Sequence, residues 1–323
     1  MNSGIIIRRM RRIPFVALIL WSATFVESLA QTSLRVADQK GSSRAVMEAA
    51  GVLKDLPYTI DWKEFAAAAP LLEALGAGAV DTGLAGDAPF SFAVASGAPL
   101  KAIAALRQSQ IGLAIMVPKE SSAQSFDDLK GKKIATGRGS VGHQLILAAL
   151  ESKGLKTSDV QIIFLTPADA KVAYTLGSVD AWSTWEPYIS QEQVLFGARP
   201  VITGDGLTAG LLFQVATDTA IWEKRVQLED FLSRLIKARL WALNNVESYA
   251  AIWGKLMGIP AEVPLNWFRR SRTRVDDIED SVVSDEQKTI DLYYRHALIK
   301  QKLNAADFMD RSFSAIFDGA SGP

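Results

Sequence analysis

Hydrophobic and polar positions follow a repeating order along this chain, in which a short apolar run is succeeded by a longer amphipathic segment. Apolar runs such as SLRVAD (33–38), LKAIAAL (100–106) and VQIIFL (160–165) have the length and composition of buried strands. Amphipathic segments such as SVGHQLILAALESKG (140–154) have the spacing of helices. Because strands and helices alternate through short loops, the pattern predicts an α/β architecture with parallel sheets.

The other expected elements continue this order and suggest how the chain is divided. Further strands are expected at 58–62, 82–86, 112–118, 133–137, 180–185 and 211–215, and further helices at 45–50, 70–81, 88–97, 125–132 and 167–177. No repeat or Pro/Ser-rich linker marks a boundary, so the division must come from topology. Two apolar stretches, around 107–117 and 206–216, lack turn signatures and are predicted to cross between two lobes. The predicted lobes are 31–110 with 212–323, and 111–211.

The first thirty residues have the pattern of an export signal. Four arginines between positions 8 and 12 precede an apolar stretch, 13–26, which is short for a membrane span. Small residues at positions 28 and 30, which a signal peptidase reads, offer a cleavage site, and we expect cleavage after Ala30. An uncleaved anchor is the alternative, and the polar residues that follow disfavour it.

Composition and charge exclude several classes of function. The chain has 323 residues, 49% hydrophobic and 22% charged, which is globular composition with length for two domains. Removing four arginines and Glu27 with the leader leaves 31 basic and 34 acidic residues, and no basic patch predicts a nucleic-acid partner. There is no cysteine, which excludes disulfides, thiol nucleophiles and thiolate metal sites. The two histidines, His143 and His296, are far apart, so neither a metal site nor a cofactor is predicted.

The segment GRGSVGH, at 137–143, is the most conspicuous motif. It fits the G-x-G-x-x-G pattern of dinucleotide-binding loops and lies between an expected strand and an expected helix. The next strand, however, ends in Thr166-Pro167 without the acidic residue that would hold a ribose. What remains is a helix start with unpaired N–H groups and partial positive charge, which glycine lets an anion approach. Ser140 either caps the helix or donates to a ligand.

Three more loops lie at the carboxyl ends of expected strands, with the sequences ADQKGSS, AGDAPF and STWEPY. In open α/β sheets ligands bind at these ends, so we expect the four loops to surround one small ligand. Asp87 suits a helix N-cap as well as a ligand contact. Trp185 suits core packing as well as the wall of a binding site.

The sequence contains few groups of residues whose types and spacing could support catalysis. Ser140 and His143 are three residues apart at a helix start, and Glu186 is an available acid. No G-x-S-x-G elbow or pair of carboxylates at useful spacing occurs, so no catalytic residue is predicted. An enzyme that acts on a sulfur or phosphate ester through Ser140 and His143 is the alternative to a binding protein.

Three long segments, 82–106, 126–155 and 165–190, closely resemble the substrate-binding proteins of ABC importers for aliphatic sulfonates. That group also covers taurine and nitrate, and a receptor for one of these or another small anion stays an alternative. The resemblance implies an α/β, two-lobed periplasmic binding protein type II fold (a Venus flytrap) with two crossover strands. It also implies a monomer in the periplasm that delivers an alkyl or aryl sulfonate to an ABC transporter permease.

Matching motifs carry the ligand contacts of that group over to this chain. The implied ligand-binding residues are Gln39, Gly86, Asp87, Gly139, Ser140, Val141, Trp185 and Glu186. Arg138 and His143 are expected to be bystanders.

The chain also departs from the group's pattern. Phe90 replaces a proline, Leu211 and Leu212 stand where a polar and an aromatic residue are expected, and Asp38 replaces a tyrosine. Glu186 stands where that group has aspartate. These changes leave the organic tail open and are compatible with a bulkier or aromatic sulfonate. Sulfinate desulfinases and thiamine-pyrimidine synthases share the fold, but their chemistry needs cysteines that this chain lacks.

Overall fold

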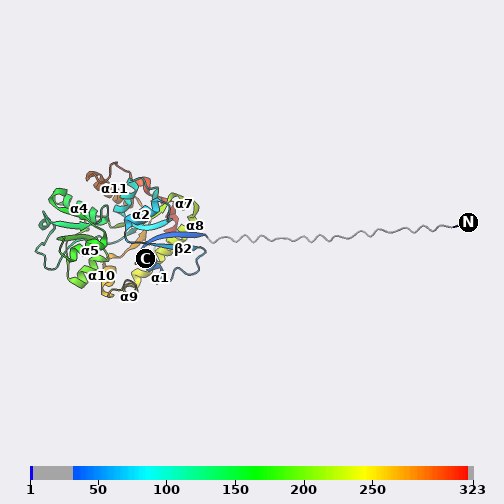
Figure 1. The fold of residues 1–323 in the computed structure, drawn as a ribbon, viewed down its shortest axis with the longest axis horizontal. Coiled ribbons are helices and arrows are strands. Elements are labelled where there is room, and N and C mark those ends of the chain that lie inside the picture. Colours follow the sequence, from blue (N-terminus) through cyan, green and yellow to red (C-terminus); the bar gives the residue numbers. More distant parts are fainter. Residues whose placement is uncertain (3–31, 319–323) are drawn as a thin grey trace. The chain divides into compact units, whose positions relative to one another are not determined.

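The computed structural model describes residues 1–2 and 32–318. Apart from its first two residues, the expected export signal lies outside the described residues, as does its cleavage site. Between residues 32 and 318 the strands assemble into two separate sheets with helices packed on them (Figure 1). Figure 1 shows α4 (Val141–Ser152) and α5 (Pro167–Thr175) on one side of this part, and α8 (Arg225–Asn244) on the other.

The first sheet has six strands in the order β11-β4-β10-β3-β1-β2. Their bounds are β1 Ser33–Gln39, β2 Thr59–Phe65, β3 Thr82–Gly86, β4 Leu100–Arg107, β10 Leu211–Thr217 and β11 Arg274–Asp276. β1 is parallel to β2 and β3, whereas β10 is antiparallel to both β3 and β4.

The second sheet has five strands in the order β7-β6-β8-β5-β9. Their bounds are β5 Leu113–Val117, β6 Lys133–Thr136, β7 Gln161–Phe164, β8 Ala181–Trp185 and β9 Arg199–Thr203. β6 is parallel to β7 and β8, and β5 is antiparallel to β8 and β9.

Helices connect most of these strands and form the region after β10. The other α-helices are α1 Ser43–Ala49, α2 Ala68–Gly76, α3 Asp87–Ala95, α6 Tyr188–Phe196, α7 Asp218–Glu223, α9 Val246–Met257, α10 Glu262–Ser271 and α11 Asp280–Arg295. Short 3₁₀ turns are η1 Gln110–Gly112, η2 Phe126–Leu129, η3 Thr157–Asp159, η4 Ala305–Phe308 and η5 Arg311–Ile316.

The chain passes between the two sheets where the sequence predicts crossovers. It leaves the first sheet after Arg107 and enters the second at Leu113, then leaves at Thr203 and returns at Leu211. The two predicted crossovers are therefore confirmed. The exact lobe boundaries at 110 and 211 stay a prediction.

Three details of the sequence prediction are wrong. The sheets are mixed rather than parallel, because a strand that returns from the other sheet runs against its neighbours. The helix expected at 125–132 is only the turn η2, which the Ser125–Asp128 capping box starts and Gly131 at φ +74° follows. Strands β9 and β11 were not predicted, since β9 contains Pro200 and β11 has only three residues.

Alternation along β1 explains how the first sheet builds two core layers. Leu34 and Val36 pack on one face with residues of α1 and α8 such as Phe231. Ala37 points to the other face and packs with residues of α2 and α3 such as Leu71. Because successive side chains of a strand alternate, one strand holds helices on both faces.

A further cluster joins elements that belong to different sheets. Leu147 of α4, which follows β6 of the second sheet, packs with Ala88 of α3 and with Ile290 and Tyr293 of α11. This packing holds the middle of α4 against α3 and α11.

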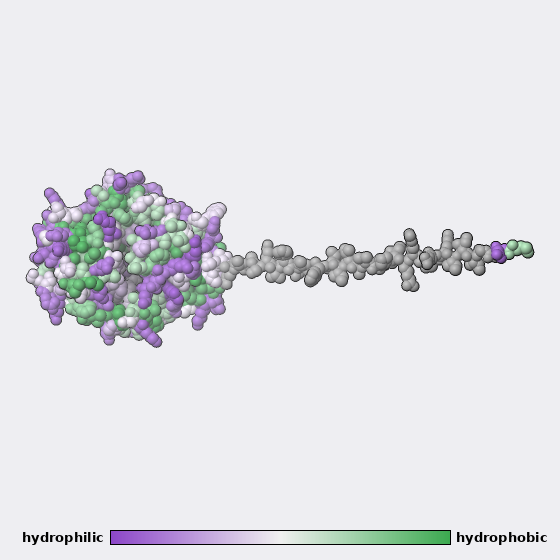
Figure 2. All heavy atoms as spheres, viewed as in Figure 1, coloured by the Kyte–Doolittle hydropathy of each residue, from purple (hydrophilic) through white to green (hydrophobic). Residues whose placement is uncertain are grey.

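Figure 2 shows hydrophilic residues spread over the visible face, with hydrophobic ones between them. Among the described residues, no helix is both long and apolar enough to cross a membrane.

Candidate functional site

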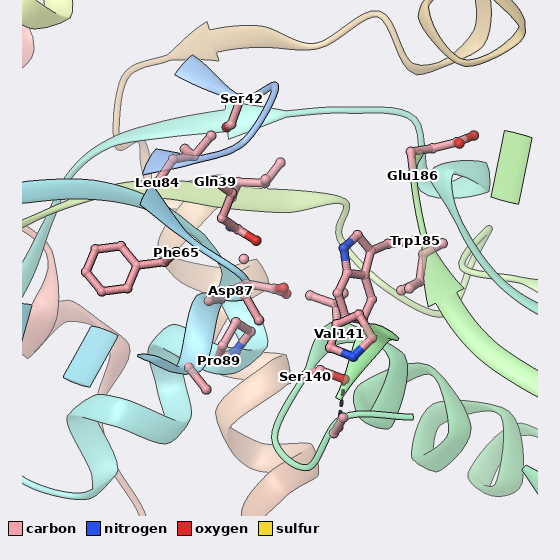
Figure 3. Close-up of a pocket in the computed structure, with 18 of the residues that line it drawn as sticks. Gln39, Ser42, Phe65, Leu84, Asp87, Pro89, Ser140, Val141, Trp185 and Glu186 are labelled. Carbon is pink, nitrogen blue, oxygen red and sulfur yellow. Dashed lines mark hydrogen bonds between the residues drawn. The ribbon is translucent and has the colours of Figure 1, made fainter. Parts of the chain in front are cut away.

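A cavity of about 1210 Å³ is lined by residues from both sheets and from α8, α9 and α10. All eight residues implied by the resemblance line it: Gln39, Gly86, Asp87, Gly139, Ser140, Val141, Trp185 and Glu186. Figure 3 shows Gln39 and Asp87 on one side of the space and Trp185 with Val141 on the other. The four loops expected to meet do meet, and their roles in ligand binding stay a prediction.

The positions of these residues follow from the ends of the strands. Gln39 ends β1, Gly86 ends β3 and Trp185 ends β8, while the segment 137–140 follows the end of β6. Gly86 lets α3 and α4 approach closely, since a Cβ atom there would lie 2.7 Å from Cγ1 of Val141. The carboxyl ends of strands from two sheets therefore meet around one space.

The glycine-rich loop is held by its own hydrogen bonds. Gly139 adopts φ +67°, and its N–H donates to Nδ1 of His143 at 3.2 Å. The Ser140 hydroxyl donates to the Gly137 carbonyl at 2.7 Å and accepts from the His143 N–H at 3.2 Å. Ser140 is thus the N-cap of α4, which was one of the two roles that the sequence suggested for it, the other being a ligand contact. The N–H groups of the first two helical residues, Val141 and Gly142, have no acceptor within the helix.

His143 has a structural role that sequence reasoning missed. Its side chain is 2% exposed, and burial lowers its pKa to about 4, with Arg138 and His296 adding to the effect. The imidazole is therefore neutral at pH 7, which leaves Nδ1 free to accept from Gly139. No Ser–His dyad forms, because Ser140 contacts the backbone N–H of His143 rather than its ring.

Asp87 is buried, and protein groups take up its carboxylate. Its Oδ2 accepts from Nε2 of Gln144 on α4 and from Oγ1 of Thr289 on α11, both at 3.0 Å. Burial raises the pKa of Asp87, and it raises the pKa of the neighbouring Glu286 far more, with Asp87 itself contributing. Ser91 donates to Glu286. Through these buried hydrogen bonds, Asp87 connects its own helix α3 to α4 and α11.

Glu186 is also engaged by protein groups. Its carboxylate accepts from Arg270 of α10, from the Ser190 hydroxyl at 3.0 Å and from the Ser190 N–H at 3.0 Å. Burial raises the pKa of Glu186, and Arg270 opposes that effect. Figure 3 shows the side chain pointing away from Ser140. Through Ser190 and Arg270, Glu186 connects α6, which follows β8 of the second sheet, to α10.

Aromatic and aliphatic side chains form much of the remaining wall. Trp185 is partly exposed and packs edge-on against Tyr188 at 6.2 Å between ring centroids. Leu211 and Leu212, two departures from the family pattern, both line the cavity. Phe90, the third, faces the core and packs against Phe213 at 5.3 Å.

Several wall residues come from the helical region to which the sequence interpretation gave no role. These are Arg239 of α8, Trp253 and Met257 of α9, and Trp267 of α10. Within residues 32–318, no group of three or more His, Asp or Glu side chains is placed to hold a metal ion.

Comparison with known proteins identifies relatives of this chain. A family described as NMT1/THI5 like matches residues 60–207. A protein of Escherichia coli (strain K12), named for aliphatic sulfonate binding, is 34% identical over 84% of this chain and 86% of its own length.

Two solved structures are similar in fold as well as in sequence. The alkanesulfonate-binding protein SsuA from Xanthomonas axonopodis pv. citri, bound to MOPS, superposes with a TM-score of 0.81 at 30% identity, covering 87% of this chain and 98% of that one. The periplasmic aliphatic sulphonate binding protein SsuA from Escherichia coli gives 0.78 at 32% identity, covering 85% and 96%.

Proposed function

The chain belongs to the family of aliphatic sulfonate-binding proteins, and we propose that it captures an organosulfonate and delivers it to an ABC importer. The observation that carries this proposal is the convergence of all eight implied ligand residues on one cavity. In the proposed complex the sulfonate lies at the start of α4 and near Gln39, and the organic tail lies against Trp185.

The start of α4 has the physical properties that a sulfonate needs. The N–H groups of Val141 and Gly142 are unpaired within the helix, and the N-terminus carries about half a positive charge. A sulfonate stays ionised over the physiological pH range, so it gains from donors that do not titrate. The fixed loop from Gly137 to Ser140 keeps those donors in place before the ligand arrives.

The size and composition of the cavity favour a ligand with an organic tail. Its volume of about 1210 Å³ is above the range of roughly 300–1000 Å³ that is usual for ligand pockets. Nitrate or taurine would leave most of it unfilled. Leu212 and Trp185 add apolar wall for an alkyl or aryl group.

We propose binding without turnover. The enzyme alternative required Ser140 to be activated by His143, and the ring nitrogen Nδ1 is already paired with the Gly139 N–H. Without that activation, Ser140 is an ordinary hydroxyl that caps a helix.

Export and partnership belong to the same proposal. Cleavage after Ala30 would place Gln31 at the start of a monomeric periplasmic receptor, whose ligand-bound form docks to a permease. N-terminal sequencing of the exported protein tests the cleavage site.

The direct test is a thermal-shift and calorimetric screen of the mature chain against alkyl and aryl sulfonates, taurine, nitrate and sulfate. An organosulfonate at a hundred times its Kd should stabilise the fold by about 2.7 kcal/mol. Carboxylates of the same chain length serve as matched controls for the head group. Stabilisation by taurine or nitrate alone would favour the small-anion receptor, and product formation from any sulfonate would favour an enzyme.

A further inference from the structure

One end of the cavity carries a cation, Arg239, whose guanidinium forms no hydrogen bond with the described residues. We name it the α8–α10 end and define it by Gly41, Arg239, Trp253 and Trp267, all of which line the cavity. Trp253 donates from Nε1 to the Gly41 carbonyl at 2.6 Å, and its ring lies 5.5 Å from that of Trp267. These contacts place the loop after β1 and two helices around the same space.

Two buried donors at this end have no partner among the described residues. They are Nε of Arg239 and Nε1 of Trp267. Both groups can donate but not accept, and a buried donor without an acceptor is unfavourable. Protein covers both of these atoms, so an occupant of the cavity meets Arg239 through its terminal nitrogens Nη1 and Nη2, which are not among the buried atoms and form no hydrogen bond with a described residue.

The nearest acid does not supply that acceptor. Asp38, which stands in this chain where the resemblance predicts a tyrosine, interacts with Arg239 electrostatically. Its two carboxylate oxygens accept from the N–H groups of Ser43 and Arg44, at 2.9 and 3.3 Å. Burial raises the pKa of Asp38 to about 7, so it balances the charge of Arg239 only in part at neutral pH.

The end of β1 and the loop after it contribute to both sites, with Gln39 near the proposed sulfonate and Gly41 at this end, but the helices of the two sites differ. The loop at the start of α4 contacts α3 and α11, through Phe92 and Tyr293. Arg239 lies instead with Asp38 of β1 and Tyr249 of α9. A single sulfonate group at the start of α4 therefore leaves the donors of the α8–α10 end unpaired.

Resting on the proposed function, we propose that the α8–α10 end is a second anion subsite and that the ligand is an organosulfonate with a second acidic group, a carboxylate. The fork of a guanidinium matches the planar carboxylate, which can accept from Nη1 and Nη2 of Arg239 together. The large cavity holds a molecule that reaches both subsites. The organic tail of the ligand, whether alkyl or aryl, then ends in a carboxylate.

The experiment compares straight-chain alkanesulfonates with ω-sulfocarboxylates of the same length by calorimetry, over a series of lengths. The intact receptor should bind the best sulfocarboxylate about tenfold more tightly than its matched alkanesulfonate, as expected for a charge-assisted pair. Arg239→Gln should weaken the sulfocarboxylate about tenfold more than the alkanesulfonate.

Lys237→Gln is the matched control, because Lys237 is an exposed cation on the same helix. Alkanesulfonate binding with no preference for the sulfocarboxylate would overturn the second subsite and leave the proposed function standing. Equal losses for both ligands in Arg239→Gln would show that Arg239 holds the sulfonate or only supports the fold, and would also overturn it. Failure of every sulfonate to bind would overturn the proposed function itself. A thermal melt of each variant separates loss of binding from loss of folding.

Discussion

Acidification should destabilise this protein through His143, whose neutral ring accepts a hydrogen bond from the Gly139 N–H. Burial lowers the pKa of His143 from 6.5 to about 4. As pH falls, the unfolded chain takes up the proton first, near pH 6.5, while the folded chain resists until about pH 4. The stabilisation is therefore complete above pH 6.5 and is lost as pH falls from 6.5 to 4.

The size of the effect follows from the two pKa values. A difference of one pH unit is equivalent to about 1.4 kcal/mol, so a pKa lowered from 6.5 to about 4 corresponds to about 3 kcal/mol of unfolding free energy. The side chain is only 2% exposed, so solvent screens the effect little. Protonation also removes the acceptor that holds the Gly139 N–H, so the loop before α4 should loosen with it.

The assay is chemical denaturation of the wild type and of His143→Asn at intervals from pH 7 to pH 4. Asparagine keeps an oxygen near the position of Nδ1 but does not titrate. Groups whose pKa burial raises, such as Asp38 and Glu286, oppose the effect in both proteins and cancel in the comparison. The wild type should lose about 3 kcal/mol relative to the variant between pH 6.5 and 4. A difference between the two proteins that stays constant with pH would refute the reasoning.

Three substitutions test other parts of the site. Ser140→Ala should cost about 1 kcal/mol of stability as a lost N-cap and on the order of 1 kcal/mol or more of sulfonate binding, and an affinity unchanged in calorimetry would remove Ser140 from the ligand contacts. Glu186→Gln should lower the unfolding free energy by about 3 kcal/mol because it leaves Arg270 without its charge partner, and denaturation curves that coincide with wild type would contradict this. Gly142→Ala should cost about 1–3 kcal/mol in a thermal melt, since its Cβ would lie 2.6 Å from a carbonyl oxygen of β8; an unchanged Tm would show that α4 shifts freely.

Much of the fold was predictable because its strands are short, buried and bounded by glycine or proline. The strand end at Gly86 and the crossover stretch around 107–117 are visible in the apolar pattern alone. The convergence of four loops was predictable too, because the carboxyl ends of parallel strands meet at one edge of each sheet, and two lobes that face each other across these edges enclose one space. β9 escaped prediction because Pro200 interrupts its apolar pattern, and because an edge strand such as β9 tolerates a proline that a central strand would not.

The state of the two acids in the site could not be predicted. Asp87 and Glu186 sit in motifs that suggest a ligand, yet their carboxylates pair with residues far away in sequence. Thr289 is 202 positions from Asp87, and Arg270 is 84 positions from Glu186. A local motif states which side chain stands at a strand end but not which distant helix packs beside it. Such pairings depend on the tertiary arrangement of α10 and α11.

Arg239 is a different case, because the sequence does contain a signal for it. Along α8, Leu228, Leu232 and Leu235 are buried at spacings of four and three, and the next position of that stripe is Arg239. The exposed Lys237 lies two residues earlier, about 200° away around the helix. A charge that continues an apolar stripe must be paired, solvated or matched by a ligand, and in the described structure it faces a cavity. Helical periodicity, applied to charged as well as apolar positions, would therefore have identified this residue as a candidate for binding without any motif.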